Sequence, residues 1–464
     1  MTIGQLPDNV LLEIFRFYRV AVLRFRDYTW NWYTLAHVCS RWRQVILASP
    51  HLLDPRLICT ARTPVMEMLD VYPTFPIIID CQHLVSSISH TFMGWGNIIA
   101  ALRCRDQACW ISLSGLTGPL LGFFVTMMKD PFPALTFLEL RSNDGIDGLA
   151  PVLPEAFLGQ FAPRLQYLIL QGISFPTLPS LLFSADDLVS LHLADIPITG
   201  CIAPEVLTVS LSALPRLRWL IIMFTSPTPL TNRTAQQPPP ITRAVLPSLT
   251  FLSFRGASEY IEDLVARIRA PRLNHINTQF FEQALFDTPE LFRFISRSRK
   301  LRSLNRATVS FYHSLAKIVF GSSEGTLRPR HVSLGISCGG SNRQISSVAQ
   351  ICSQYMPLLS NVKWLNIKGG ECLQPGWQDE TNSAQWLELL HPFTAVERLH
   401  ISERLGPLIV RAFQGLTGER ATVLPLLHSL FLQGLLPSAS VREVIDPFIT
   451  ARHLSGCPIA VRWG

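Results

Sequence analysis

The feature that most constrains the fold is a short apolar pattern that returns about every 30 residues. Residues 133 to 140 read P-x-L-x-x-L-x-L, and the same pattern begins again at Pro163, Pro215, Pro247 and Pro425. The leading positions of these and of looser copies are Leu135, Leu165, Leu188, Leu217, Leu249, Leu273, Leu301, His331, Val362, Val396 and Leu427. Their spacing stays between 23 and 34 residues. A period of this size is typical of a repeat array.

Each repeat contains the pattern of a strand followed by the pattern of a helix. The x-L-x-L core predicts a short strand, and helical stripes lie between several strands. Two such stripes are Ile261, Leu264, Val265 and Ile268, and Ile345, Val348, Ala349 and Cys352. One such unit cannot bury its apolar face alone, so we expect neighbours to stack into a solenoid with a strand-lined concave face and a helical convex face.

The repeats resemble an irregular leucine-rich-repeat array, which implies an α/β horseshoe. The usual Asn or Cys ladder after the strand is largely missing. A doubly wound α/β domain, which also alternates strand and helix, is the alternative. The segment SPTPLTNRTAQQPPP, residues 226–240, interrupts the array, and its proline density predicts an exposed loop insertion.

The first 60 residues follow a different pattern. In LPDNVLLEIF, residues 6 to 15, and its continuation, Leu11, Ile14, Phe15 and Tyr18 recur at helical spacing, with Pro7 suited to the first helical position. A second helix is predicted from a stripe that stops before Pro50: Leu35, Val38, Cys39, Trp42, Val45 and Ile46. Two such helices make a very small core, which usually gains stability by packing against a partner.

This stretch is similar to the F-box: L-P-x-x-V-L-x-x-I-F, then L-x-x-V-C-x-x-W-R and S-P-x-L. The family motif docks a chain onto the Skp-type adaptor of a cullin ubiquitin ligase. The resemblance implies an adaptor-binding set made of Leu6, Pro7, Val10, Leu11, Ile14, Phe15, Leu35, Val38, Cys39, Trp42 and Leu52. The sequence departs from the family at Asn9, Ser40 and Leu53. An ordinary amphipathic hairpin packed on the rest of the chain is the alternative.

Residues 59 to 79 look like the linker of a large group of F-box proteins in mushroom-forming fungi. We therefore expect an all-helical F-box at 1–58, a linker and N-terminal cap of the array at 59–105, and the solenoid at 106–464.

Composition excludes several classes of function. The net charge of +7 comes from 40 basic and 33 acidic residues with no long run of one sign, so no nucleic-acid arm is expected. The ten cysteines form no C-x-x-C pair of a zinc site, and we expect no metal or cofactor. No signal peptide or membrane span is apparent, so we expect a cytoplasmic or nuclear protein without membrane contact.

One short motif keeps a catalytic hypothesis open. Gly335-Ile-Ser337-Cys-Gly339 matches G-x-S-x-G, follows an apolar strand and precedes a helix predicted from Ser341 to Gln354, as a nucleophile elbow requires. Against a serine hydrolase, Leu334 and Ile336 keep the repeat register and no H-G-G-G-type loop precedes the motif. We therefore expect no enzymatic activity.

Together these patterns predict the substrate-recognition subunit of a cullin-type ubiquitin ligase, in which the F-box binds the adaptor and the array binds a target protein. A scaffold that binds the adaptor without promoting ubiquitin transfer is the alternative. Strand residues that alternate with the buried leucines face the concave side. One position before the second leucine, this gives a predicted target-binding row rich in aromatic residues: Phe137, Tyr167, Trp219, Phe251, His275 and Trp364.

Overall fold

The structure is a computed structural model. It describes residues 6–23, 32–81, 92–143, 150–226, 243–281, 287–302, 304–322, 331–338, 340–370, 383–414, 423–434 and 439–463. Apart from Ser226, the predicted Pro-rich insertion lies outside the described residues, as does Gly339. The chain divides into two compact units, Met1–Leu188 and Val189–Gly464. The predicted boundaries after residue 58 and after residue 105 stay predictions.

The first unit begins with a small group of helices. They are α1 (Asp8–Leu23), α2 (Trp32–Ala36), α3 (Ser40–Ala48) and α4 (Pro50–Leu53). Phe15 of α1 and Trp42 of α3 meet edge to face, with ring centroids 4.9 Å apart, and both are buried. The predicted stop before Pro50 is confirmed, because α3 ends at Ala48.

The second helix predicted from the sequence is broken in two. Cys39 has an extended backbone (φ −161°, ψ 168°), and its Sγ accepts a hydrogen bond from the Trp42 backbone N–H at 3.5 Å. Cys39 therefore caps α3 from outside the helix, and Leu35 and Val38 precede the break. A side chain that satisfies a free backbone N–H at the first turn favours a new helix start over continuation of the old one.

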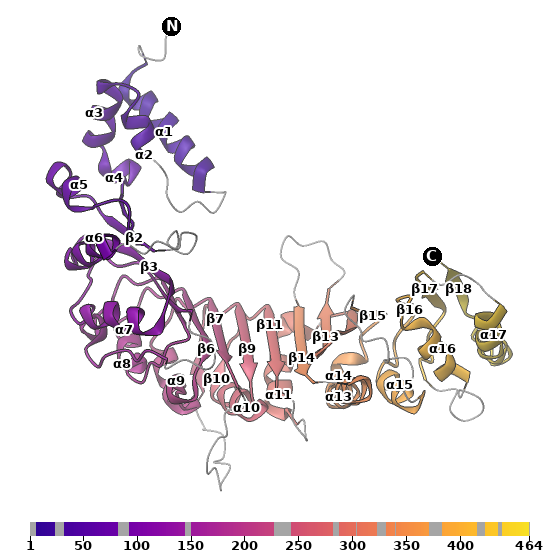
Figure 1. Ribbon diagram of the computed structural model, residues 1–464. Helices are drawn as coiled ribbons and strands as arrows, with labels where there is room; N and C mark the ends of the chain where they lie inside the picture. The colour runs from indigo at the N-terminus through magenta and orange to yellow at the C-terminus, as the bar shows by residue number, and fades with distance from the viewer. Residues whose placement is uncertain are drawn as a thin grey trace. The chain divides into compact units, whose positions relative to one another are not determined.

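The same unit continues with parallel strands and helices (Figure 1). The strands lie side by side in chain order: β1 (Leu57–Cys59), β2 (Ile77–Asp80), β3 (Ala108–Leu116), β4 (Phe137–Ser142) and β5 (Tyr167–Gln171). The segments between and after them contain α5 (Met66–Val71), α6 (Phe92–Arg103), α7 (Gly118–Met127), the 3₁₀ helix η3 (Phe157–Gln160) and α8 (Leu178–Leu182). Parallel pairing thus begins at Leu57, within the region that the sequence assigned to F-box, linker and cap.

The second unit repeats this arrangement. Its main strands are β6 (Ser190–Ile196), β7 (Trp219–Phe224), β9 (Phe251–Gly256), β11 (His275–Phe280), β12 (Arg306–Phe311), β13 (Leu315–Gly321), β14 (His331–Ser337), β15 (Trp364–Gly369), β16 (Arg398–Ile401), β17 (Ser429–Leu432) and β18 (Ala460–Trp463). A separate parallel pair joins β8 (Ala244–Val245) and β10 (Ile268–Arg269).

The helices of the second unit lie on one side of these strands (Figure 1). They are η4 (Ile198–Gly200), α9 (Pro204–Ser212), α10 (Ser258–Arg267), α11 (Pro289–Arg297), α12 (Arg299–Arg302), α13 (Ser341–Gln354), α14 (Met356–Leu359), α15 (Ser383–Leu390), α16 (Gly406–Gln414) and α17 (Ala439–Leu454). In β7, Leu220, Ile222 and Phe224 are buried, whereas the alternating residues are half-buried. One strand face is therefore covered and the other is open.

The predicted period is confirmed over most of the chain. Nine strands begin two residues after a predicted leading position, as β9 does after Leu249 and β15 does after Val362. Ile261, Leu264 and Val265 are buried in α10, and the stripe from Ile345 to Cys352 is buried in α13, which has the predicted bounds. With helices on one face, this is a leucine-rich-repeat-like arrangement and not a doubly wound domain.

The prediction was wrong around Leu301, where the sequence indicated one more strand. Leu301 lies in α12, and β13 runs antiparallel between β12 and β14. The order of strands is therefore β11, β14, β13, β12, β15. The cause is a short connection: the backbone N–H of Tyr312 bonds to the carbonyl oxygen of Leu315 at 2.8 Å. So tight a turn allows only antiparallel pairing, since parallel neighbours need a long crossover.

Candidate functional site

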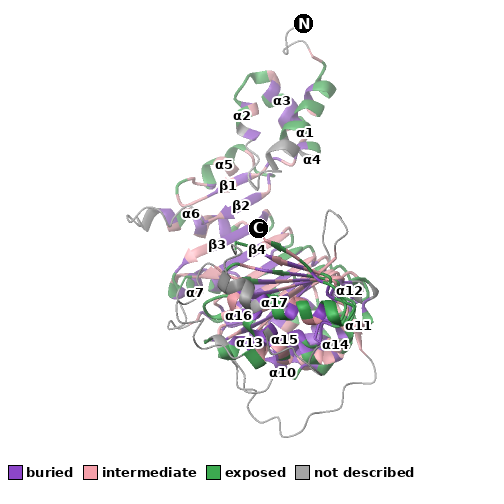
Figure 2. Ribbon diagram, turned by 90° about the vertical axis from the view of Figure 1, so that its right-hand side faces the viewer, coloured by how far each residue is buried: buried purple, intermediate pink, exposed green. Residues whose placement is uncertain are grey.

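Helix α1 has a wide apolar arc of which its own unit covers only part. Leu11 and Phe15 are fully buried, whereas the side chains next to them around the helix remain exposed. The exposed apolar residues are Val10 (38% exposed), Ile14 (41%), Phe17 (75%) and Tyr18 (42%). We call these four residues the α1 strip; Figure 2 shows exposed and buried residues together on this helix. A contiguous exposed apolar patch marks an interaction surface.

The structure sorts the residues of the predicted adaptor-binding set by exposure. Leu11, Phe15 and Trp42 are buried in the core of the helical group. Leu6 and Leu35 are half-buried, and the exposed members are Pro7, Val10, Ile14, Val38, Cys39 and Leu52. The buried members shape the surface that the exposed members form, and Trp42 remains 9% exposed. Adaptor contact by this set stays a prediction.

Polar contacts fix the start of α1 onto α3. Arg41 Nη2 donates to the carbonyl oxygen of Leu6 at 2.5 Å and to Asp8 Oδ1 at 2.7 Å. Asn9, where the resembled motif has an acidic residue, is exposed, and Leu53, where it often has tryptophan, is buried. The two hydrogen bonds donated by Arg41 hold the beginning of the α1 strip in a defined position.

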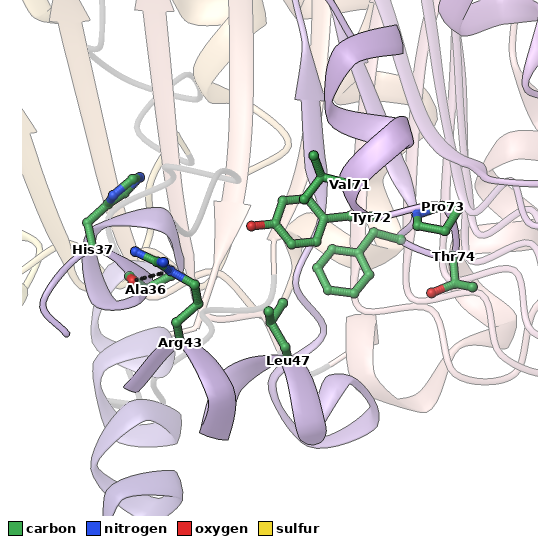
Figure 3. Close-up of a pocket in the computed structure, with 9 residues that line it drawn as sticks. Ala36, His37, Arg43, Leu47, Val71, Tyr72, Pro73 and Thr74 are labelled. Atoms are coloured by element: carbon green, nitrogen blue, oxygen red, sulfur yellow. Dashed lines mark hydrogen bonds between the residues drawn. The ribbon is translucent and has the colours of Figure 1, made fainter. Parts of the chain in front are cut away.

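A pocket of about 620 Å³ lies beside these helices, also within the first unit. His37 and Arg43 lie at one end and Pro73 and Thr74 at the other, with Leu47 and Tyr72 between them (Figure 3). The remaining lining residues are Ala36, Val71 and Phe75. The lining has no carboxylate and no Ser, Cys or Lys; its polar side chains are those of His37, Arg43, Tyr72 and Thr74.

The predicted target-binding row lies at the first residues of the strands. In the first unit, Phe137 begins β4 and Tyr167 begins β5, in direct register. Trp110 of β3 stacks on Phe137 with centroids 3.6 Å apart. The sequence analysis missed Trp110 because no leading proline and leucine precede it, although W-I-S-L at 110–113 differs from the x-L-x-L form only by isoleucine in place of the first leucine.

In the second unit the row is also continuous in register. Trp219 pairs with Phe251, Phe251 with His275, and His275 with His331. The rings of Phe251 and His275 lie 6.2 Å apart, and those of His275 and His331 4.7 Å apart. All four rings are half-buried. The row is thus a semi-exposed aromatic surface on the open strand face, and its binding of a target stays a prediction.

Trp364 lies farther along the same row and brings two residues that the sequence analysis missed. It pairs in register with Arg306 of β12 and with Arg398 of β16. The guanidinium carbons of these arginines lie 3.9 Å and 4.8 Å from the indole centroid, within the range of cation–π attraction. The sequence analysis expected a strand to begin just after Leu301. It therefore did not identify Arg306 as the first residue of β12.

From β7 onward the charged residues of the strands have one sign, whereas β6 of the same unit contains Asp195. The strands from β7 to β18 contain arginine, lysine and histidine but no aspartate or glutamate. Partial burial, and then the charges of Lys368 and Arg398, lower the pKa of His400 from its usual value. A positive potential of this kind attracts anionic groups.

The serine of the G-x-S-x-G motif is not arranged as a nucleophile. Ser337 is the last residue of β14, pairs with Leu315 of β13, and accepts a hydrogen bond on its Oγ from Gln279 Nε2 at 2.9 Å. Ser337 is not among the described residues whose φ is positive, whereas the serine of a nucleophile elbow lies on a sharp, strained turn. An amide N–H is a donor and cannot take the hydroxyl proton, so Gln279 cannot serve as the general base.

The described part of the chain contains no group of three or more His, Cys, Asp or Glu side chains arranged to hold a metal ion. Its cysteines are free thiols. Burial raises the pKa of Cys59 to about 12 and that of Cys109 to about 11, which makes both poor nucleophiles. Among the helices described, none has the length and hydropathy needed to cross a bilayer.

Comparison with known proteins gives one family match. Residues 3–53 match the F-box-like family. No curated protein matches the chain. The leucine-rich repeat-containing protein LegL7 from Legionella pneumophila is 15% identical, with 75% of this chain and 98% of that chain covered and a TM-score of 0.29. These matches do not test the resemblance of residues 59–79 to a fungal group.

The family match covers the helices that carry the α1 strip, and the strands that follow it show the repeat geometry directly. The chain therefore has an F-box-like domain at its N-terminus, followed by a leucine-rich-repeat-like region of parallel strands and helices.

Proposed function

We propose that the chain is the substrate-recognition subunit of a cullin-type ubiquitin ligase. In this proposal the F-box-like domain binds a Skp-type adaptor and, through it, the cullin, while the open strand face binds a target protein. The observation that carries the proposal is the α1 strip: four apolar side chains of the matched domain that its own helices leave exposed.

The physical argument begins with the size of the helical group. Its core contains few large side chains, among them Leu11, Phe15 and Trp42. A core this small stabilises a fold only marginally, and burial of further apolar area against a partner adds to it, at about 25 cal/mol per Å² removed from water. Val10, Ile14 and Phe17 supply that area on a single helix face.

The repeat region needs no active site for this role. A receptor that holds its target near a charged ubiquitin-conjugating enzyme converts an encounter in solution into an effectively intramolecular one. The hydrogen-bonded Ser337 and the buried thiols of Cys59 and Cys109 support a non-catalytic receptor. A chain that binds the adaptor but delivers no ubiquitin is the competing scaffold role.

The test separates contact residues from core residues of the same helix. Val10→Asp with Ile14→Asp changes two residues of the α1 strip, and Leu11→Asp with Phe15→Asp changes two buried neighbours. We expect the first pair to weaken adaptor capture about 100-fold while the helices stay folded, because each desolvated, unpaired charge costs more than about 1 kcal/mol at an interface. The second pair places charges in the core and should unfold residues 6–53 as well.

The matched control is Asn9→Asp with Arg16→Asp, two exposed positions on the polar side of α1. Capture should stay within about 3-fold of the wild-type value, since these side chains lie outside the apolar arc. Co-purification with the adaptor measures capture, and limited proteolysis of residues 6–53 reports the fold. Undiminished capture by the Val10 and Ile14 variant would overturn adaptor docking. Normal capture without ubiquitin transfer to a bound target would support the scaffold role.

A further inference from the structure

The most distinctive arrangement on the open strand face is one indole ring flanked by two arginines. Arg306 and Arg398 lie on the strands on either side of Trp364, and both side chains are exposed. The two guanidinium groups contact the same ring, at 3.9 Å and 4.8 Å from its centroid. The ring orders both side chains while their N–H groups remain available to a ligand.

Within the described part of the chain, neither guanidinium forms an ion pair with a carboxylate. Glu397 precedes Arg398, but it already bonds to Lys363 Nζ at 2.9 Å. Like charges held close together repel, and the cation–π contacts offset only part of that cost. An uncompensated pair of ordered cations fits a site that an anionic ligand completes.

A second basic pair lies farther along the same strands. Lys317 of β13 and Lys368 of β15 are the direct neighbours of Ser310 of β12. Ser310 is four residues after Arg306, and four residues along a strand span about 13 Å. The lysines and the arginines therefore form two separate rows on one face.

The face also has an open position beside the arginines. Gly321 of β13 lies in register between Arg306 and His331, and a Cβ atom added to it would meet nothing within 4 Å. Because Gly321 has no side chain between those of Arg306 and His331, this position leaves room for a side chain of a partner.

From these observations we infer that the strand face around Trp364 binds an acidic, extended segment of the target, whose Asp or Glu side chains pair with the arginine row and, about four residues away, with the lysine row. This inference rests on the proposed function and names the chemistry of its target. The two arginines flank one ring and the two lysines lie about 13 Å farther along the strands, so the four cations are divided between two rows. Such spacing suits several singly charged carboxylates better than one phosphate, and each guanidinium can take a carboxylate with two parallel bonds.

The experiment uses the full chain, alone and mixed with a Skp-type adaptor, and fluorescent 12-residue peptides built from Gly and Ser. One peptide carries two Asp four positions apart, a second carries them two positions apart, and a third has Asn in place of both. A phosphoserine peptide and a single-stranded RNA of similar length complete the set. Fluorescence polarisation at low and physiological salt gives the affinities.

The test variant is Arg306→Glu with Arg398→Glu. Its matched control is Lys300→Glu with Arg411→Glu, which makes the same change in charge at exposed positions of α12 and α16 on the helix side. We expect the four-spaced acidic peptide to bind most tightly. The test variant should lose at least about 10-fold in affinity, because each lost charge-assisted pair and each new repulsion lowers binding. The control should change it by less than about 2-fold.

Equal binding of the Asp and Asn peptides, or equal loss in the test and control variants, would overturn the inference. Preference for phosphoserine or for RNA over the acidic peptide would overturn it in favour of those ligands. Adaptor capture is measured on the same samples. If capture holds while the peptides fail, only the acidic segment is excluded; if peptides bind while capture fails, the proposed receptor function is excluded instead.

Discussion

The two faces of the second unit's strands treat charged groups in opposite ways. On the helix side, Arg267 of α10 pairs with Asp263 at 3.0 Å and with Glu205 of α9 at 3.1 Å. Glu262 accepts two backbone N–H bonds at 2.8 Å from the first turn of α11. On the open side, Arg306 and Arg398 have only an aromatic ring between them.

The difference shows where the chain satisfies its own charges and where it leaves them for a ligand. Helices that pack against one another desolvate their charged groups, and such groups need partners because an unpaired buried charge is costly. Solvent stabilises the cations of the open face, so the chain can fold without pairing them with carboxylates. Unpaired charge on this face is therefore informative about binding, whereas paired charge on the helix face is informative about stability.

The largest expected difference between the faces concerns aromatic residues of a single strand. Phe254 of β9 is 1% exposed and packs against Phe224 and Tyr260, whereas Phe251 of the same strand is half-buried on the open face. We expect Phe254→Ala to lower the free energy of unfolding by about 4 kcal/mol, and Phe251→Ala by about 1 to 2 kcal/mol. Urea unfolding of the two variants measures both values.

The double variant Trp219→Ala with Phe251→Ala tests whether the aromatic residues of the open face bind the target. Because both rings lie on the open face, its loss of stability should stay below that of Phe254→Ala alone, while capture of the target falls. Equal destabilisation by Phe251→Ala and Phe254→Ala would show that the row is core. A stable double variant that still holds its target would remove these two residues from the binding surface.

The repeats could be predicted well from the sequence because a short local pattern identifies most of the strands. The x-L-x-L alternation assigns residues to faces, and leading positions such as Leu249 and Val362 fix where strands begin. The antiparallel strand β13 escaped prediction because its buried residues Ala316, Ile318 and Phe320 alternate without the leading leucine. Its pairing follows from a tight turn near Tyr312, a feature that a period of 30 residues does not contain.

The candidate sites were harder to predict, for a different reason. Periodicity put Leu11, Ile14 and Phe15 on one stripe of α1, but it could not tell which of them the chain's own helices would cover. Likewise, Arg306 and Arg398 are 92 residues apart in the sequence and meet only because β15 lies between their strands. The absence of acidic residues from the strands β7 to β18 was the available signal, and it becomes visible only when strand and loop charges are counted separately.

The carboxyl of Glu262 gives the helix face a pH dependence that the open face can be compared with. Burial, and then the nearby charges of Glu290 and Asp287, raise its pKa to about 7 from 4.5, although two N–H bonds oppose the shift. Because the folded state holds this proton more tightly than the unfolded chain, its contribution to stability is complete below about pH 4.5 and is lost as the pH rises through 7.

We therefore expect Glu262→Gln to become more stable relative to the wild type between pH 5 and pH 8, by about 2 kcal/mol after allowance for partial solvent exposure. The amide oxygen keeps an acceptor for the N–H groups of Glu290 and Leu291. Urea unfolding at both pH values measures the difference. Glu262→Ala, which has no acceptor, should be less stable than Glu262→Gln at both. A constant difference between wild type and Glu262→Gln would show that the carboxyl does not titrate in this range.

The smallest expected effect concerns the ring between the two arginines. Trp364→Ala removes two cation–π contacts, worth about 0.5 to 1 kcal/mol each at exposed sites, and leaves Arg306 and Arg398 facing each other across a gap. Losing both arginines' contact with the ring should lower the free energy of unfolding by about 1 kcal/mol in low salt, and by less in 1 M salt, which screens the remaining repulsion. Trp364→Phe keeps an aromatic face and should lose less than half as much. Urea unfolding at two salt concentrations separates these terms. A loss above about 3 kcal/mol that salt does not change would mean that Trp364 is a packing residue, and that the arginines lie over it without depending on it.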